Sequence, residues 1–99
     1  IYTYKTICLN SRSHVVTVDG ATVELTFKEF ELLKYLLQNE GTVLTRDMLL
    51  EKIWGYDFDG ETRTADVHIR TLRAKLGDAG QYIETVRGVG YRIGGAQND

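Results

Sequence analysis

Basic side chains recur at short intervals in residues 64–76, which read TADVHIRTLRAKL. Arg70, Arg73 and Lys75 supply guanidinium and ammonium donors, and this stretch holds no acid after Asp66. Such donors bind phosphates and carboxylates, and an arginine can also give two parallel hydrogen bonds to a guanine edge. The residue types therefore indicate either recognition of an anionic partner or an ordinary solvated helix face.

The positive charge is concentrated in one part of a chain that is acidic overall. The 99 residues carry a formal net charge of -2. Residues 1–61 hold six Lys and Arg against ten Asp and Glu, whereas residues 62–93 hold six against three. Because a phosphate meets the field of the local surface, the second segment is the predicted contact with a polyanion.

A helix over about residues 62–76 would separate these side chains by face. One side carries the apolar spacing of a packed helix, at Ala65, Ile69, Leu72 and Leu76. The opposite side carries basic and short side chains, at Arg63, Val67, Arg70, Thr71 and Ala74. Thr64 and His68 lie on one flank, and Asp66 and Arg73 lie on the other. Such a narrow basic face suits the DNA major groove, where threonine and valine methyls can touch the thymine methyl.

A second basic feature is the stretch TVRGVGYR at residues 85–92. Arg87 stands directly before the turn Gly88-Val89-Gly90, which would carry it to the tip of a hairpin. A tip arginine can enter a narrow minor groove. An ordinary glycine turn with charged neighbours is the alternative, and the adjacent basic helix favours the first interpretation.

The rest of the chain must position these two features. The N-terminal part predicts a small antiparallel sheet, with strands at Lys5–Asn10, His14–Val18 and Val23–Leu25 and a tight turn at Asp19-Gly20. Thr26 and Glu29 have the form of a capping box, so a helix is predicted from there to a stop at 39–41.

A second helix is predicted from the cap Thr45 to Gly55, after a short strand at Thr42–Leu44. Thr62 or Thr64 would cap the third helix, and Gly77 would follow its end. Residues 82–87 and 91–93 complete the hairpin. The fold class is therefore α+β, with one domain over residues 1–95 and a flexible tail at 96–99.

Composition narrows the functional class further. Cys8 is the single cysteine, so neither an internal disulfide nor a thiolate zinc cage is expected. No apolar stretch approaches the ~20 residues of a membrane span, which predicts a cytoplasmic protein without membrane contact. His68 and Asp66 are separated around the helix and no nucleophile is placed beside them, so an enzyme is not expected. No metal or cofactor is predicted.

Four segments of the chain resemble one family in order. They are LTFKEFELLKYLLQNEG (25–41), LTRDMLLEKIWG (44–55), RTADVHIRTLRAKLG (63–77) and IETVRGVGYRI (83–93). Together they resemble the winged helix-turn-helix effector domain of OmpR/PhoB-type response regulators. The resemblance implies sequence-specific binding of double-stranded DNA and regulation of transcription, with a recognition helix at about 62–76 and a hairpin wing at about 82–93.

The resemblance also assigns individual contacts. It implies that bases are read by Val67, Arg70, Thr71 and, from the wing, Arg87. Phosphate contacts are implied for Trp54, Arg63, Thr64, His68, Arg73, Thr85 and Tyr91, although Trp54 could equally be a core residue. Relatives often carry arginine at the position of Thr71, so the bases read there are expected to differ.

The same resemblance implies partners. The family's effector domain normally follows a receiver domain that is phosphorylated on an aspartate by a histidine kinase, within a two-component phosphorelay. The chain is therefore expected to be a fragment, monomeric by itself, that pairs on direct repeats when receivers dimerise. Asp19, Asp57 and Asp59 are not expected to be the phosphoacceptor.

The loop at 55–61, GYDFDGE, corresponds to the family's connection implicated in contacting RNA polymerase. Tyr56, Asp57, Phe58 and Asp59 could form that contact, or the two aromatic rings could fold inward over the core. A protein-interaction module that has lost DNA binding is the remaining alternative for the whole domain. Such a module could carry acids or apolar residues at positions 67, 70 and 71. The arginine at position 70 favours DNA binding over this alternative.

Overall fold

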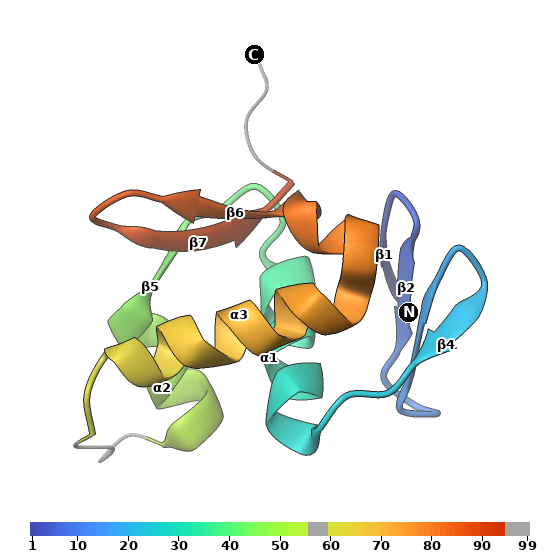
Figure 1. Cartoon of the computed structure of the whole chain (residues 1–99). Coiled ribbons are helices and arrows are strands. Elements are labelled where there is room, and N and C mark those ends of the chain that lie inside the picture. The colour runs from blue at the N-terminus through green and yellow to red at the C-terminus, as the bar shows by residue number, and fades with distance from the viewer. Residues whose placement is uncertain (56–59, 95–99) are drawn as a thin grey trace.

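The computed structural model describes residues 1–55 and 60–94, which form three helices and two antiparallel sheets. Figure 1 shows the N-terminal four-stranded sheet at one end of the molecule, beside the helices, and a β-hairpin running alongside helix α3. This arrangement confirms the predicted α+β class. The predicted tail at 96–99 lies outside the described residues.

The N-terminal sheet contains β1 (Tyr2–Tyr4), β2 (Ile7–Asn10), β3 (Val15–Val18) and β4 (Ala21–Val23), paired in that order. Strands β2 and β3 lie within the ranges predicted for them, β4 lies two residues earlier than predicted, and the turn at Asp19-Gly20, where both residues have positive φ, was expected. Strand β1 was not expected, since its three residues, two half-buried tyrosines on either side of the exposed Thr3, are too few to give a clear alternation in the sequence. It is held by pairing with β2.

Helix α1 (Phe27–Gln38) begins where the sequence predicts. The Thr26 hydroxyl accepts a hydrogen bond from the Glu29 amide at 3.2 Å, and the Glu29 carboxylate accepts one from the Thr26 amide at 2.9 Å. The same carboxylate receives the Lys75 ammonium group at 2.7 Å. Glu29 thus joins the start of α1 to the end of α3 while being 4% exposed.

Helix α2 (Arg46–Trp54) follows strand β5 (Leu44–Thr45) and ends at Gly55. Thr45 caps it as predicted, since its hydroxyl accepts from the Met48 amide at 3.1 Å. The predicted strand at 42–44 is displaced by a residue or two. The sequence assigned this strand no partner, and the structure pairs it antiparallel with β7 (Gly90–Ile93) of the C-terminal hairpin.

Helix α3 (Arg63–Leu76) turns the predicted stripe inward, and Ala65, Ile69, Leu72 and Leu76 are all at most 3% exposed. The predicted cap position at Thr62 is confirmed, but the capping hydrogen bond expected from a threonine side chain is absent there. Thr62 occupies the cap position in a helical conformation without a side-chain capping bond, and Thr64 lies inside the helix. Backbone hydrogen bonds from the Thr64 and Ala65 amides to Glu61 and Thr62 form the first turn instead.

A short 3₁₀ helix, η1 (Gly77–Tyr82), separates α3 from the hairpin and was not predicted. Its Gly80 lies against the Arg73 backbone so closely that a Cβ atom would overlap it. The hairpin strands β6 (Ile83–Val86) and β7 (Gly90–Ile93) match the predicted ones within a residue. With β5 they form a second sheet in the order β5-β7-β6.

The core draws on every element, and its fully buried side chains include Leu9 from β2, Leu33 from α1, Leu72 from α3 and Ile93 from β7. Cys8, on the same strand as Leu9, is only partly buried. Among residues 1–55 and 60–94, no helix has the length and apolar content needed to cross a bilayer. In that same part of the chain no three His, Cys, Asp or Glu side chains are grouped to hold a metal ion.

Replacing Glu29 by glutamine should reduce the dependence of stability on pH. Burial by itself raises the pKa of the Glu29 carboxyl, but hydrogen bonds from Lys75 and Thr26 outweigh it and lower the pKa below its ordinary value of 4.5. A group whose pKa is lowered by folding stabilises the protein above its unfolded pKa and loses that effect as pH falls through the folded one.

In urea unfolding at several pH values, Glu29→Gln should therefore lose about 1–2 kcal/mol at pH 7 and decline less than the parent protein below pH 4.5. Glu31→Gln, which removes a charge from the same helix outside the capping box, is the control. Equal declines in the parent and Glu29→Gln would contradict this role.

Candidate nucleic-acid interface

The face of α3 opposite the core is exposed along its whole length, as the helical period predicts. Val67 is 43% exposed. Arg63, Arg70, Thr71 and Ala74 are also exposed, so a basic and short-chained surface stands clear of the fold. A helix that presents such a face without neighbouring elements over it can enter a groove about 12 Å wide.

One flank of α3 is built around His68. Its Nδ1 lies 3.0 Å from the Thr64 carbonyl oxygen, and its ring meets that of Trp54 edge-on at 4.6 Å between centroids. The Lys28 ammonium lies 5.3 Å from the Trp54 ring. Trp54 is partly buried against the core. It therefore supports this flank of α3, and a phosphate contact by its indole stays a prediction.

The opposite flank is built around the carboxylate of Asp66. Its Oδ1 accepts a hydrogen bond from Arg46 Nε at 2.7 Å and another from the Tyr91 hydroxyl. These three residues come from α3, α2 and β7, so one carboxylate connects the two helices with the hairpin. The sequence had placed Asp66 only at the edge of the basic face, because no local pattern shows a partner 20 or 25 residues away.

The ionisation of this group follows from its partners. Burial by itself raises the pKa of the Asp66 carboxyl, but the hydrogen bonds from Tyr91 and Arg46 outweigh it and lower the pKa. Burial and the nearby Asp66 carboxylate raise the pKa of Tyr91, which keeps its hydroxyl protonated as the donor. The guanidinium groups of Arg46 and Arg73 also lie 5.8 and 5.5 Å from the Tyr91 ring centroid.

Arg73 adds a second connection between α3 and the hairpin. Its Nε and Nη2 atoms donate to the Ile83 carbonyl oxygen at 3.1 and 2.7 Å, and Nη2 also donates to the Thr85 hydroxyl at 2.8 Å. A guanidinium has five N–H donors, so these bonds do not exhaust it. Arg73 and Thr85, both predicted phosphate contacts, therefore lie together where α3 meets the wing.

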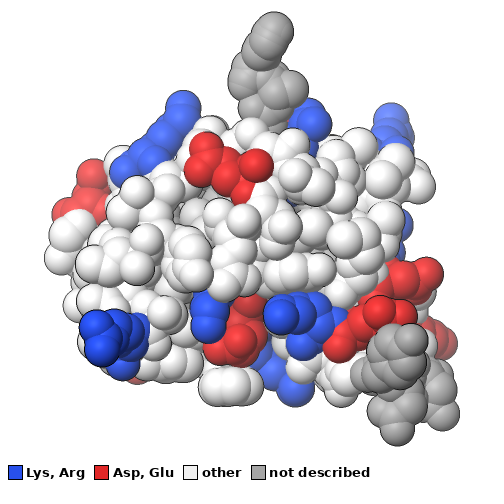
Figure 2. Space-filling view, turned by 180° about the vertical axis from the view of Figure 1, so that it is seen from behind, with Lys and Arg blue, Asp and Glu red and all other residues white. Residues whose placement is uncertain are grey.

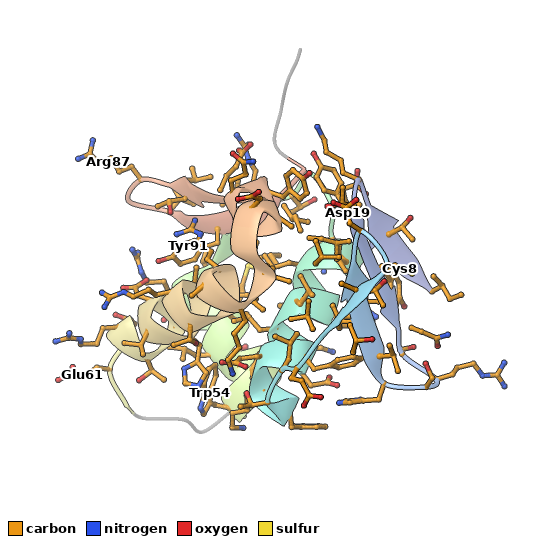
Figure 3. All side chains as sticks on the ribbon, turned by 45° about the vertical axis from the view of Figure 1, so that its right-hand side comes forward. Cys8, Asp19, Trp54, Glu61, Arg87 and Tyr91 are labelled. Carbon is orange, nitrogen blue, oxygen red and sulfur yellow. The ribbon has the colours of Figure 1, made fainter. Side chains whose placement is uncertain are left out.

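The tip of the hairpin presents Arg87. Figure 3 shows its side chain directed away from the body of the protein, with Tyr91 set back between the hairpin and α3. The two glycines of the turn are needed for different reasons. Gly88 has φ 74°, which a side chain would strain. A Cβ atom on Gly90 would overlap the Leu44 carbonyl oxygen, since β5 and β7 pair there.

Charge is distributed differently elsewhere. Figure 2, seen from behind, shows basic and acidic side chains interspersed with wide uncharged areas. On the hairpin itself Arg92 is engaged with Glu84 at 3.0 Å. Within residues 62–93, Arg63 and Arg70 on α3 and Arg87 at the wing tip are exposed, so they are the arginines available for the predicted polyanion contact.

The structure brings most of the predicted site residues together on α3 and the hairpin. Among the predicted site residues that the structure describes, only Tyr91 has its side chain turned inward, being 5% exposed with its hydroxyl bonded to Asp66. The predicted polymerase-contact residues Tyr56, Asp57, Phe58 and Asp59 lie outside the described residues. Sequence reasoning missed Arg46 and Asp66, which hold the surface in place.

Comparison with known proteins agrees with this geometry. The family described as "Transcriptional regulatory protein, C terminal" matches residues 20–93. The sensory transduction protein RegX3 of Mycobacterium tuberculosis is 48% identical over 85 residues, which cover 83% of this chain and 37% of RegX3. The chain thus spans well under half the length of that relative.

Solved structures show the same fold. The DNA-binding domain of the response regulator AdeR, in complex with an intercistronic region, superposes with a TM-score of 0.85 at 31% identity over 95% of this chain and 99% of that one. DrrB, an OmpR/PhoB homologue from Thermotoga maritima, gives 0.84 at 32% identity over 95% of this chain and 44% of that one.

The helices, the basic face of α3 and the C-terminal hairpin define a winged helix-turn-helix domain. The chain belongs to the family of transcriptional regulatory protein C-terminal domains, of the OmpR/PhoB response-regulator type. The predicted resemblance is confirmed. The family is one of regulators rather than enzymes, as the sequence indicated.

Replacing Tyr91 by phenylalanine should loosen the wing while keeping the ring in place. The change removes the hydroxyl that donates to Asp66, at an expected cost of about 1 kcal/mol in the free energy of unfolding. Amide hydrogen exchange in β6 and β7 should accelerate more than in α1. Tyr82→Phe, at a half-buried tyrosine outside this network, is the control, and equal exchange in the two variants would argue against the connection.

Proposed function

We propose that this domain binds double-stranded DNA in a sequence-specific manner as the output domain of a two-component response regulator, and so controls transcription. One observation carries the proposal: the exposed basic face of α3 stands beside an outward arginine at the wing tip, and side-chain bonds fix the two relative to each other. In this arrangement α3 enters the major groove and the wing reaches the neighbouring minor groove.

The proposed contacts divide by chemistry. Val67, Arg70 and Thr71, on the outermost line of α3, are assigned to base edges. Charged, hydroxyl and imidazole donors at the start of α3, on its flanks and on β6 are assigned to phosphate oxygens, namely Arg63, Thr64, His68, Arg73 and Thr85. Trp54 and Tyr91 keep the phosphate role that the family resemblance implies. For Tyr91 this role requires its hydroxyl to leave Asp66.

The remainder of the mechanism lies beyond this chain. A receiver domain phosphorylated by a histidine kinase would dimerise and place two such domains on direct repeats. Two domains reading the same side of the duplex would stand about one helical turn apart. Residues 55–61 are the proposed contact with RNA polymerase. A regulator acting on DNA in this way would work in the cytoplasm.

Two arginine variants test base reading against phosphate binding. On a duplex selected from a random library, Arg70→Ala should cost about 1–3 kcal/mol and relax the preference at one base pair. Arg63→Ala should weaken all duplexes alike and flatten the slope of log affinity against log salt by about one unit. Arg63 is a cleaner probe than Arg73, which also holds the wing. The division of roles is wrong if both variants show one pattern.

The wing is tested by duplexes that differ only in their flanks. Arg87→Ala should remove the preference for an A·T-rich flank over a G·C-rich one, because a narrow minor groove attracts the guanidinium. Arg92→Ala removes a basic residue of the same hairpin that is paired with Glu84, and should keep the preference. Equal losses on both flanks in Arg87→Ala would show that this residue meets only the backbone.

A further inference from the structure

Thr71 lies on the exposed side of α3, yet its hydroxyl is used inside the protein. Oγ1 donates to the His68 carbonyl oxygen at 3.1 Å, one turn back along the helix. A threonine that makes this bond has committed its single hydroxyl proton to the backbone. On the exposed side the residue therefore offers a ligand its Cγ2 methyl group and, from the hydroxyl oxygen, an acceptor but no donor.

The surroundings of Thr71 keep the hydroxyl turned inward. The Glu29 carboxylate lies beneath this part of α3, only 6% exposed and bonded to Lys75. This carboxylate also lies near the Thr71 hydroxyl, as a second acceptor inside the protein. Both acceptors near Oγ1 therefore belong to the protein, and turning the hydroxyl outward would give up an internal hydrogen bond.

We infer that Thr71 is a specificity-determining residue that reads the 5-methyl group of a pyrimidine through its own methyl group. This inference rests on the proposed DNA binding. Val67, one turn earlier on the same line of α3, is 43% exposed and extends the apolar strip. Arg70 beside them offers guanidinium donors. The methyl group is the one major-groove feature that distinguishes thymine from uracil, and 5-methylcytosine from cytosine.

The alternative at this position is a hydrogen bond from the Thr71 hydroxyl to a base. The two readings differ in what each substitution removes. Thr71→Val deletes the hydroxyl and keeps the methyl, whereas Thr71→Ser deletes the methyl and keeps the hydroxyl. A base hydrogen bond would therefore survive in the serine variant, and methyl recognition would survive in the valine variant.

The experiment begins with duplexes that this chain selects from a random library. In each selected duplex the thymines are then replaced by uracil, one at a time. Loss of one buried methyl contact should weaken binding by the parent protein about fourfold at the position that Thr71 reads. Thr71→Val should bind the uracil duplex more weakly by the same factor, and Thr71→Ser should bind the thymine and uracil duplexes equally well. Replacing cytosine by 5-methylcytosine at that position should strengthen binding by the parent protein and leave binding by Thr71→Ser unchanged.

Val67→Ala serves as the matched control. It should remove the preference for thymine over uracil at a different base pair and keep that preference at the base pair read by Thr71. Thermal unfolding of all variants verifies that they fold. The inference is overturned if Thr71→Val no longer distinguishes thymine from uracil while Thr71→Ser still does. It is also overturned if substitutions of Thr71 change the effect of uracil at no position, although the selected duplex is still bound more tightly than a scrambled one. Failure of the library to yield any preferred duplex would instead refute the proposed function itself.

Discussion

The carboxylate of Asp66 is the point on which the proposed DNA-binding surface depends. It projects from α3 and receives hydrogen bonds from Arg46 of α2 and from Tyr91 of β7. Arg73 adds bonds from α3 to β6. A recognition helix and a wing can read adjacent grooves only if the distance between them is fixed, and these half-buried bonds fix it. They also explain why an acid belongs at the edge of a basic face.

The remaining structure holds α3 so that its polar face is outward. Four apolar side chains anchor the inner face, and the salt bridge from Lys75 to Glu29 ties the end of α3 to the start of α1. On the flank near Trp54, aromatic contact with His68 supports the helix from α2. Because every side of α3 except the outer one is engaged, the outer side chains are presented on a rigid support. Preorganisation of this kind lowers the cost of binding.

Patterns confined to a few neighbouring residues were predicted correctly. The period of α3 gave its buried and exposed faces, the capping box gave the start of α1, and the glycine turn gave the wing. Features that depend on distant partners were not. Strand β1 exists because β2 pairs with it, and β5 because β7 does. The absence of a side-chain capping bond at Thr62 and the hydrogen bonds of Asp66 likewise depend on the packing of one element against another. No pattern among neighbouring residues in the sequence predicts that packing.

The central claim, a wing tip held in the minor groove beside a helix in the major groove, is tested most directly by cleavage from an iron chelate attached to Val89→Cys in a Cys8→Ser background. Val89 is 46% exposed at the tip. Cleavage should fall on both strands to one side of the selected site. The cuts on the two strands should be offset in the 3′ direction, which is the pattern produced when the iron chelate lies in the minor groove. The parent protein labelled at Cys8, which lies on the sheet far from Arg87 in Figure 3, should give no localised cut. Cuts offset in the 5′ direction, or no localised cleavage from position 89, would contradict the account.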